Sequence, residues 1–425
     1  MTAKRRSGHR RWFVCSQLAL IIMVNYLDRG NLGVVLPQIQ KEFALSNSQL
    51  GLVMSAFQWT YAFANVAMGF AVDFIGPRWL ILIAGMGWTI CAASTGIAQG
   101  LLGLVAARAL LGLMESPMFP AGIRIVTTWF PDRERAVAIS FYEIATSTGN
   151  LLAPLLAAIL AQLFGWRVMF LTIAALTIPL LGFWAFFYRE PEADPKLSRR
   201  EYDYIQSGIS QSGMGRRPGI TQWLFLLTQW RTWIMITGGM SLAGTQSFLL
   251  WLPNYLQLVQ HFSLLEVGKT LSVFGLFHIA GIILGSFLSD RLVRRNVPVL
   301  RARTLVLSAG AFCGGIMLAF VALTSSLPPL LVLVSSGYFF LGIGVTSWWA
   351  LVPVAAPRAE LVASLGSLQN GGLFLGMALS PLLSGWLLDH GYGYGVLMVF
   401  SSAFGAMAAV LYGYVLPRYA DKIQS

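Results

Sequence analysis

Long apolar runs separated by short polar turns dominate the chain, as in residues 79–98 and 171–187. A helix needs roughly 20 apolar residues to cross about 30 Å of hydrocarbon. Strands of a membrane barrel would instead alternate polar and apolar positions over roughly ten residues. The pattern therefore predicts an all-α membrane protein with twelve transmembrane helices, near residues 13–37, 48–71, 79–99, 101–129, 136–163, 166–188, 231–256, 268–289, 299–322, 329–355, 361–386 and 393–416.

The predicted helices form two sets of six that resemble each other. Gly69 and Asp73 begin a turn with basic residues after the second helix, and Gly285 and Asp290 do so after the eighth. Parallel repeats of six helices form a large transporter fold that binds substrate at the bilayer midplane between its halves. We therefore expect an N-terminal bundle at 1–188, a cytoplasmic linker at 189–230 and a C-terminal bundle at 231–425. Residues 201–210 of the linker are expected to form a surface helix.

Composition and charge agree with a membrane protein. Of the 425 residues, 56% are hydrophobic and only 11% are charged, whereas soluble domains have roughly 25% charged residues. The net charge of +12 would suit nucleic acid, but only Lys41, Arg167 and Lys269 fall in loops on the predicted outer side. This distribution follows the positive-inside rule. It predicts a bacterial inner-membrane protein with both termini in the cytoplasm and no nucleic-acid partner.

Glycine pairs four residues apart occur inside or beside three of the predicted helices. They are Gly96/Gly100, Gly281/Gly285 and Gly372/Gly376. Small residues at this spacing allow neighbouring membrane helices to approach closely. We therefore expect these pairs to form helix contacts.

A few ionisable residues lie inside the predicted helices, where insertion costs at least about 2.5 kcal/mol each. They are therefore functional candidates: Asp28, Arg29, Arg108, Glu115, Arg124 and Glu143. Neighbours on a helix point about 100° apart, so Asp28 and Arg29 cannot face one partner. We expect Arg29 to face a central cavity and to bind the substrate carboxylate through its planar guanidinium. The alternative is an ion pair that only fixes helix packing.

Arg108 and Glu115 are two helical turns apart and share a face of the fourth helix with Gly112. A network that places Asp28 against Arg108 in one conformational state would allow a proton to be coupled to movement. We therefore predict that Asp28, Glu115 and Arg108 couple protons to transport. For Glu115 the alternative is a permanently neutral, hydrogen-bonded acid.

Two further pairs are gating candidates. Arg124 and Glu143 lie near the cytoplasmic ends of the fourth and fifth helices, where they would form either an inner gate or a structural bridge. Asp73 would cap the helix that follows the turn ending in Arg78 and would pair with a basic residue across the bundle.

The remaining binding candidates are polar or aromatic residues near the middle of helices. Hydroxyl and amide groups there would bind substrate hydroxyls, while aromatic faces cover its carbons. Each could equally make only a helix-packing contact. They are Tyr26, Tyr61, Thr146, Asn150, Gln246, Thr346, Ser347, Trp349 and Asn370.

Several motifs resemble those of the major facilitator superfamily. The turn at 69–78 resembles its signature loop. Four further segments are similar to the anion:cation symporter family, which includes bacterial galactonate and other sugar-acid transporters. These segments are 25–32, Arg108 to Pro120 with its glycine, glutamate and prolines, 127–136, and 251–255.

The resemblance implies roles for individual residues. In the sugar-acid symporters, the residues matching Asp28 and Glu115 are protonation sites and the residue matching Arg29 contacts substrate. Tyr61 and Asn370 match positions that contact substrate there. Thr146 differs, because the galactonate-like sequences have a longer amide at its position.

Two more departures from the resembling proteins bear on the cargo. Glu143 stands where those galactonate-like sequences have a neutral residue. The seventh helix has no arginine, unlike the vesicular glutamate transporters, which favours a monoanion.

The leading hypothesis is therefore proton-coupled symport of a small organic anion, a sugar acid such as a hexonate or aldarate. The alternatives are symport of an aromatic or other non-sugar carboxylate, or a membrane-embedded enzyme. The chain has four histidines and no GxxxxGK[ST] or HExxH motif, so neither ATP-driven pumping nor enzyme chemistry is favoured. We expect no cofactor and no metal, and a monomer whose partners are the organic anion, protons and the lipid bilayer.

Overall fold

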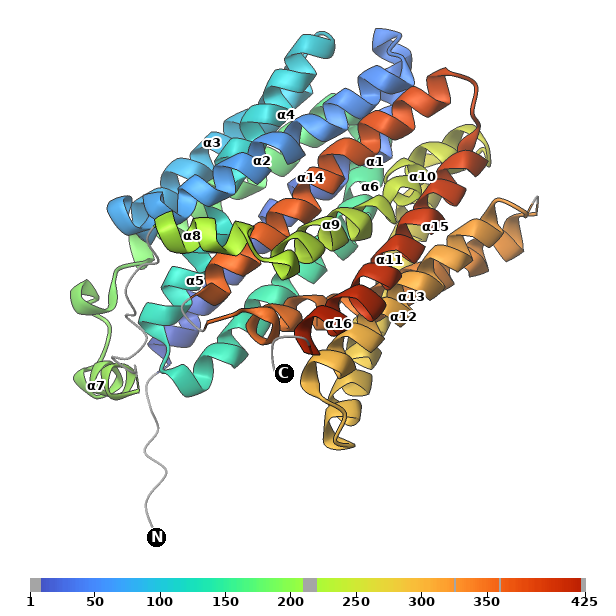
Figure 1. Cartoon of the computed structure of the whole chain (residues 1–425). Coiled ribbons are helices and arrows are strands. Elements are labelled where there is room, and N and C mark those ends of the chain that lie inside the picture. Colours follow the sequence, from blue (N-terminus) through green and yellow to red (C-terminus); the bar gives the residue numbers. More distant parts are fainter. Residues whose placement is uncertain (1–8, 209–219, 325, 359–360, 422–425) are drawn as a thin grey trace. The chain divides into compact units, whose positions relative to one another are not determined.

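The computed structural model describes residues 9–208, 220–324, 326–358 and 361–421, and within these ranges the regular structure is helical (Figure 1). Nine helical stretches in them are long and apolar enough to cross a membrane. The predicted helical membrane architecture is confirmed in the described part of the chain. The number twelve stays a prediction.

The chain divides into two compact units by the proximity of its backbone. Unit 1 comprises Met1–Leu32 and Phe63–Gly215, and unit 2 comprises Gly33–Ala62 and Arg216–Ser425. The first two helices are each divided between the units. The predicted domain bounds describe the two sequence repeats instead, and they stay a prediction.

Unit 1 contains the beginning of one helix, the end of the next, and the helices up to the linker. In chain order these are α1 (Arg10–Phe43), α2 (Asn47–Ile75), α3 (Pro77–Ile97), α4 (Leu101–Glu115), α5 (Met118–Trp129), α6 (Asp132–Phe187), the short 3₁₀ helix η1 (Pro191–Ala193) and α7 (Arg199–Ser207). The linker helix predicted at 201–210 is present as α7, which starts two residues earlier and ends at Ser207, and residues 209 and 210 lie outside the described ranges.

Unit 2 contains the other parts of α1 and α2 and the helices that follow the linker. These are α8 (Ile220–Leu227), α9 (Trp230–Gly244), α10 (Ser247–Leu258), α11 (Leu264–Arg294), α12 (Val299–Val321), α13 (Leu327–Ala355), α14 (Val362–Asp389), α15 (Tyr394–Val410), the π-helical turn η4 (Leu411–Val415) and α16 (Leu416–Asp421). The most extensive contacts in this unit join α13 to α11 and α12, and α14 to α9.

Glycine and proline set the breaks in unit 1. Gly165 has a φ of 81° inside α6, a conformation that glycine adopts without steric cost. It separates the two helices predicted at 136–163 and 166–188. Gly76, with a φ of 79°, separates α2 from α3, and Pro77 occupies the first helical position of α3, where its missing N–H costs nothing. Asp73 is therefore part of α2 rather than of a loop.

The predicted glycine contacts are confirmed for most of the pairs. A Cβ on Gly281 would lie 2.0 Å from the Phe339 carbonyl oxygen, and one on Gly285 would lie 2.1 Å from that of Ile343. Gly372 and Gly376 of α14 approach the backbone of α9 in the same way, and Gly96 of α3 approaches Arg167 of α6. The prediction is wrong for Gly100, which precedes α4 with no atom near its missing Cβ.

Candidate functional site

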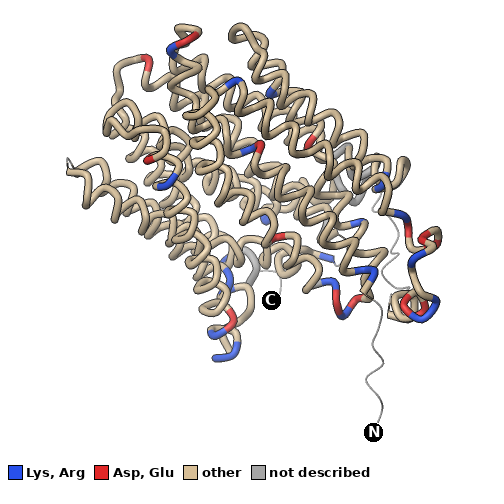
Figure 2. Tube along the Cα trace, turned by 180° about the vertical axis from the view of Figure 1, so that it is seen from behind, with Lys and Arg blue, Asp and Glu red and all other residues tan. Residues whose placement is uncertain are grey.

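Charged residues gather near the ends of helices, and the middles of the helices carry few charges (Figure 2). Unit 1 holds four prominent exceptions. Asp28 and Arg29 come from α1, and Arg108 and Glu115 from α4. Asp28, Arg108 and Glu115 are 1%, 3% and 0% exposed. The structure therefore buries in one unit the groups that the sequence singled out for proton coupling and anion binding.

Arg29 and Glu115 form an ion pair between α1 and α4. The Arg29 Nε donates to Glu115 Oε2 at 2.6 Å, and the guanidinium lies 4.6 Å from the ring centre of Tyr26. The Arg29 side chain is 16% exposed, whereas that of Glu115 is fully buried. The Arg29 side chain is thus only partly buried. In this conformation the guanidinium of Arg29 is paired with Glu115, so its role as substrate anchor stays a prediction.

Arg108 binds an amide rather than a carboxylate. Its Nη2 donates to Asn31 Oδ1 at 3.4 Å, and its guanidinium lies 5.2 Å from the ring centre of Phe170. Asn31 is fully buried and comes one turn after Asp28 on α1. Arg108, Gly112 and Glu115 are all buried, as expected for residues on one face of α4.

Asp28 is the unusual member of the group. Neither of its carboxyl oxygens has a hydrogen-bond partner among the described residues, although both are buried. The pair that we predicted for one state, Asp28 with Arg108, is absent here, and Arg108 donates to Asn31 instead. A buried carboxylate without a cation or hydrogen bonds costs several kcal/mol or more. Protonation would remove that cost, so the arrangement suits an acid that gains and loses a proton.

Close helix contacts fix α1 at the site. A Cβ on Gly149 of α6 would lie 2.5 Å from the Met23 carbonyl oxygen, and one on Gly30 would lie 2.7 Å from Ala153 Cβ. The side chains that follow on α1 are therefore held at defined positions. Asn31 is the contributor that sequence reasoning missed. Its signal was available, since a buried amide inside an apolar helix needs a partner.

The gating candidates Asp73 and Arg78 are only partly described. The Asp73 side chain lies outside the described part of the chain. Arg78 Nη2 donates to the Ala185 carbonyl oxygen at 2.8 Å, and Trp184 Nε1 donates to the Arg78 carbonyl oxygen at 3.3 Å. Arg78 thus ties the start of α3 to the end of α6, and its gating role stays a prediction.

The other gating candidates, Arg124 and Glu143, do not pair in this structure. Arg124 and Glu143 are both exposed, and no ion pair joins them in the described ranges. Arg124 instead lies near the start of the linker, where its charge acts on Tyr188 and Glu190. Whether Arg124 and Glu143 meet in another state of a transport cycle stays a prediction.

The binding candidates of the first repeat fall in different places. Tyr26 contacts Arg29 as described. Thr146 is buried, and its hydroxyl donates to the backbone carbonyl of Glu143 at 2.8 Å, so it makes a local helix contact. Asn150 is exposed. Tyr61 belongs to unit 2, where its ring lies 4.5 Å from that of Phe374.

The candidates of the second repeat are all in unit 2 and are not gathered at one point by any described contact. Thr346 accepts a hydrogen bond from Ser286 at 3.0 Å. Ser347 is buried, and its hydroxyl has no hydrogen-bond partner among the described residues. Trp349 is 41% exposed. The other two, Gln246 and Asn370, are half-buried. Their role in binding stays a prediction.

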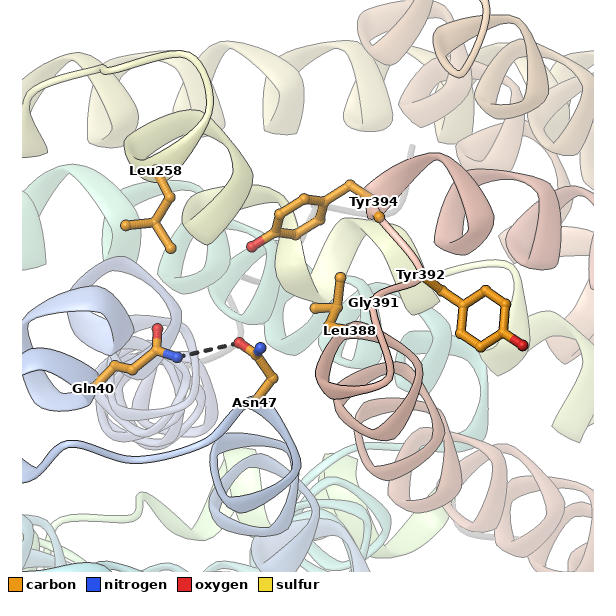
Figure 3. Close-up of a pocket in the computed structure, with 8 residues that line it drawn as sticks. Gln40, Asn47, Leu258, Leu388, Gly391, Tyr392 and Tyr394 are labelled. Carbon is orange, nitrogen blue, oxygen red and sulfur yellow. Dashed lines mark hydrogen bonds between the residues drawn. The ribbon is translucent and has the colours of Figure 1, made fainter.

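A cavity of about 340 Å³ lies elsewhere in unit 2 (Figure 3). Its polar lining includes Gln40 and Asn47, which hydrogen-bond to each other at 3.2 Å, and the tyrosines Tyr392 and Tyr394. None of the predicted site residues lines it. It therefore adds no support to the predicted binding site.

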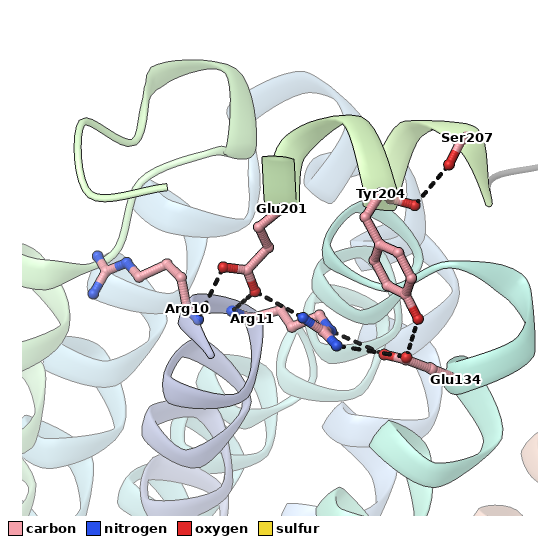
Figure 4. Close-up of polar contacts among 6 residues, drawn as sticks. All are labelled: Arg10, Arg11, Glu134, Glu201, Tyr204 and Ser207. Atoms are coloured by element: carbon pink, nitrogen blue, oxygen red, sulfur yellow. Dashed lines mark hydrogen bonds and ion pairs between the residues drawn. The ribbon is translucent and has the colours of Figure 1, made fainter. Parts of the chain in front are cut away.

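A second buried ionic cluster ties the linker to the start of α1 (Figure 4). Arg11 Nη1 lies 2.8 Å from Glu201 Oε1, and Arg11 Nε lies 2.9 Å from Glu134 Oε2. The Tyr204 hydroxyl donates to Glu134. Arg11 is 3% exposed and Glu201 2%. The sequence analysis did not predict this cluster, because the partners are far apart along the chain.

Comparisons with known proteins give the family. The model of the Major Facilitator Superfamily matches residues 18–370. The chain belongs to this superfamily. The predicted fold class is thereby confirmed, and so is the resemblance that the motifs indicated. Since the family consists of transporters, the chain is a membrane transporter, and the enzyme alternative is not supported.

The relatives include transporters of sugar acids. The chain is 30% identical over 417 residues to the D-galactonate transporter of Escherichia coli O6:H1, with 96% of both chains covered. It is 28% identical over 393 residues to the "Probable L-galactonate transporter" of Escherichia coli K12, with 92% of this chain and 86% of that one covered.

A solved structure shares the fold. It is a bacterial homolog of the human lysosomal transporter Spinster in an inward-facing and occupied conformation. The TM-score is 0.77 at 20% identity, with 98% of both chains covered.

Proposed function

We propose that the chain is a proton-coupled symporter of a small organic anion, a sugar acid such as a hexonate or aldarate. It would work as a monomer in a bacterial inner membrane with both termini in the cytoplasm. The names of the relatives support the substrate class. The observation that carries the mechanism is the ion pair between the fully buried Glu115 and the partly exposed Arg29. The residue before Arg29, Asp28, has buried carboxyl oxygens without a described hydrogen-bond partner.

The mechanism is an exchange of partners at Arg29. A guanidinium offers a planar, bidentate fork to a carboxylate, and a substrate carboxylate that takes this fork would compete with Glu115 for Arg29. Glu115 would then be a buried carboxylate without a cation. That state costs several kcal/mol, and uptake of a proton by Glu115 removes the cost. Substrate binding and protonation would therefore favour each other. Asp28 would provide a second proton site under the control of Arg108.

Substrate binding tests the anchor. Purified protein is assayed for binding of D-galactonate, galactarate, glucuronate and benzoate. Arg29→Lys is compared with Arg294→Lys, which makes the same substitution at an exposed site. Lysine keeps the positive charge but lacks the planar guanidinium that binds a carboxylate through two N–H groups. We expect Arg29→Lys to weaken binding at least about tenfold, equivalent to one lost charge-assisted hydrogen bond. Unchanged affinity would remove Arg29 from the anchor role, and preference for benzoate would favour the aromatic alternative.

Transport in proteoliposomes tests the coupling. Glu115→Gln is expected to abolish accumulation driven by a pH gradient and to leave counterflow exchange intact, because the glutamine cannot carry a proton. Glu192→Gln, on the exposed linker, is the control and should behave as wild type. Normal accumulation by Glu115→Gln would exclude Glu115 as a coupling site.

A further inference from the structure

A groove lies between α11, α12 and α13 of unit 2, which run side by side in Figure 1. Its volume is about 530 Å³, and most of its lining is apolar. Leu288 of α11 and Leu305 of α12 form part of the rim, and they are 40% and 57% exposed. α11 and α12 are both long and apolar enough to cross a membrane. The groove therefore opens on a surface that lipid would cover.

Small residues create the groove. Ala309, Gly310 and Cys313 of α12 line it. A Cβ on Gly310 would lie 2.7 Å from the Phe340 carbonyl oxygen, so the floor is the α13 backbone packed directly against α12. The result is an apolar channel between the helices. Its chemistry suits a hydrocarbon chain.

Two arginines stand at one end of the groove. Arg291 and Arg295 lie one helical turn apart at the end of α11 and both are exposed. Neither guanidinium has an ion-pair or hydrogen-bond partner in the described ranges. The nearby acid is already engaged, since Asp290 lies 3.0 Å from Arg303, which also donates to Ser289. The groove thus ends in uncompensated positive charge.

From this arrangement we infer that the groove is a binding site for an anionic phospholipid. The phosphate lies against Arg291 and Arg295, and one acyl chain follows the channel beside Leu288 and Ala309. The predicted orientation places this end of α11 at the cytoplasmic surface, where basic groups between helices attract anionic headgroups. A zwitterionic phospholipid has the same chains but no net charge to match the arginines.

Native mass spectrometry of the purified full-length chain tests the site. Retention of dioleoyl phosphatidylglycerol is compared with that of dioleoyl phosphatidylcholine in wild type and Arg291→Gln/Arg295→Gln. We expect wild type to retain phosphatidylglycerol preferentially. Each lost arginine should weaken retention by about fivefold, and the double variant by about thirtyfold. Arg200→Gln/Arg294→Gln removes equal charge from exposed positions outside the groove and should retain the lipid as wild type does.

Two further measurements distinguish a lipid site with an acyl-chain channel from a site that binds only an anion or another protein. Ala309→Phe fills the channel without changing charge and should reduce phosphatidylglycerol retention. Millimolar inorganic phosphate should not displace the lipid. Equal retention of both lipids, equal loss in the two double variants, displacement by inorganic phosphate, normal retention by Ala309→Phe, or a dimer seated on this face in lipid-free protein would each overturn the proposal.

Discussion

Removing one partner of the Arg29–Glu115 pair should destabilise unit 1 strongly. Glu115 is fully buried, and its Oε2 lies 2.6 Å from Arg29 Nε. Breaking a buried ion pair by deleting one partner costs about 3–5 kcal/mol, because it leaves an uncompensated charge. The Arg29 side chain is 16% exposed, so some solvation survives at that end. We therefore expect Arg29→Met to cost about 3 kcal/mol, at the lower end of that range.

Replacing both partners should be less harmful than replacing either. Arg29→Met/Glu115→Leu removes both charges of this pair and leaves neither partner alone, and apolar replacement of a buried pair is often close to neutral. The loss of the contact between the Arg29 guanidinium and the Tyr26 ring, 4.6 Å from its centre, adds about 0.5–1 kcal/mol. The double variant should therefore unfold within about 1 kcal/mol of wild type, and the pair should show a coupling energy of several kcal/mol.

The assay is unfolding of purified protein by sodium dodecyl sulfate from mixed micelles, measured for all four members of the cycle. A second cycle with Arg124→Met and Glu143→Leu is the matched control, because these two residues are exposed and no ion pair joins them in the described ranges. Its coupling should be near zero. If the unfolding free-energy costs of the two single variants add up to that of the double variant, the claim that the two charges are energetically coupled is refuted.

Two further predictions concern packing and pH. Gly281→Ala should lower the free energy of unfolding by about 1–3 kcal/mol, because its Cβ would lie 2.0 Å from the Phe339 carbonyl oxygen. Gly182→Ala is the control and should not destabilise, because the space at its Cβ is open. Equal effects of the two substitutions in the same unfolding assay would contradict this prediction. Burial raises the pKa of the Glu190 carboxyl, against the opposing effect of the Tyr188 hydroxyl. A raised folded pKa costs stability progressively as the pH rises from the ordinary carboxyl value of 4.5 to the folded pKa, and the full cost remains above it. Wild type should therefore gain thermal stability on acidification through this range, and Glu190→Gln should remove that dependence. A difference in melting temperature between the two proteins that fails to widen from pH 4 to pH 8 would disprove it.

The helices were predictable because lipid leaves little choice. Apolar runs of sufficient length must be helical when each backbone amide needs an internal partner. The break between the helices at 136–163 and 166–188 was also predicted, and it occurs at Gly165, where glycine allows the positive φ. The end of α2 was less predictable: the helix continues through Asp73 to Ile75, because a polar residue at the membrane surface need not end a helix.

The members of the buried site were predictable, whereas their pairing was not. The cost of burying charge marks Asp28, Arg29, Arg108 and Glu115 from the sequence alone. The same criterion also selected Arg124 and Glu143, which the structure leaves exposed. Which guanidinium meets which acceptor depends on the rotation and depth of α1 against α4, and the sequence does not specify these. An amide at Asn31 competes for Arg108, so the expected carboxylate contact does not form in this structure. The linker cluster around Arg11 depends on residues 123 and 190 positions away, where no local pattern exists to reveal it.

The charge balance of the buried site argues for coupling in the proposed symport. Asp28, Arg29, Arg108 and Glu115 together are formally neutral when all are ionised. A monoanionic substrate that enters alone would leave one uncompensated negative charge in a low-dielectric interior, which proteins avoid by protonation. Entry with one proton keeps the sum at zero. Because Glu115 is the acid that the substrate would displace from Arg29, the electrostatics favour Glu115 as the group that takes that proton. The unpartnered Asp28 would be the site for any second proton that a dianionic substrate requires.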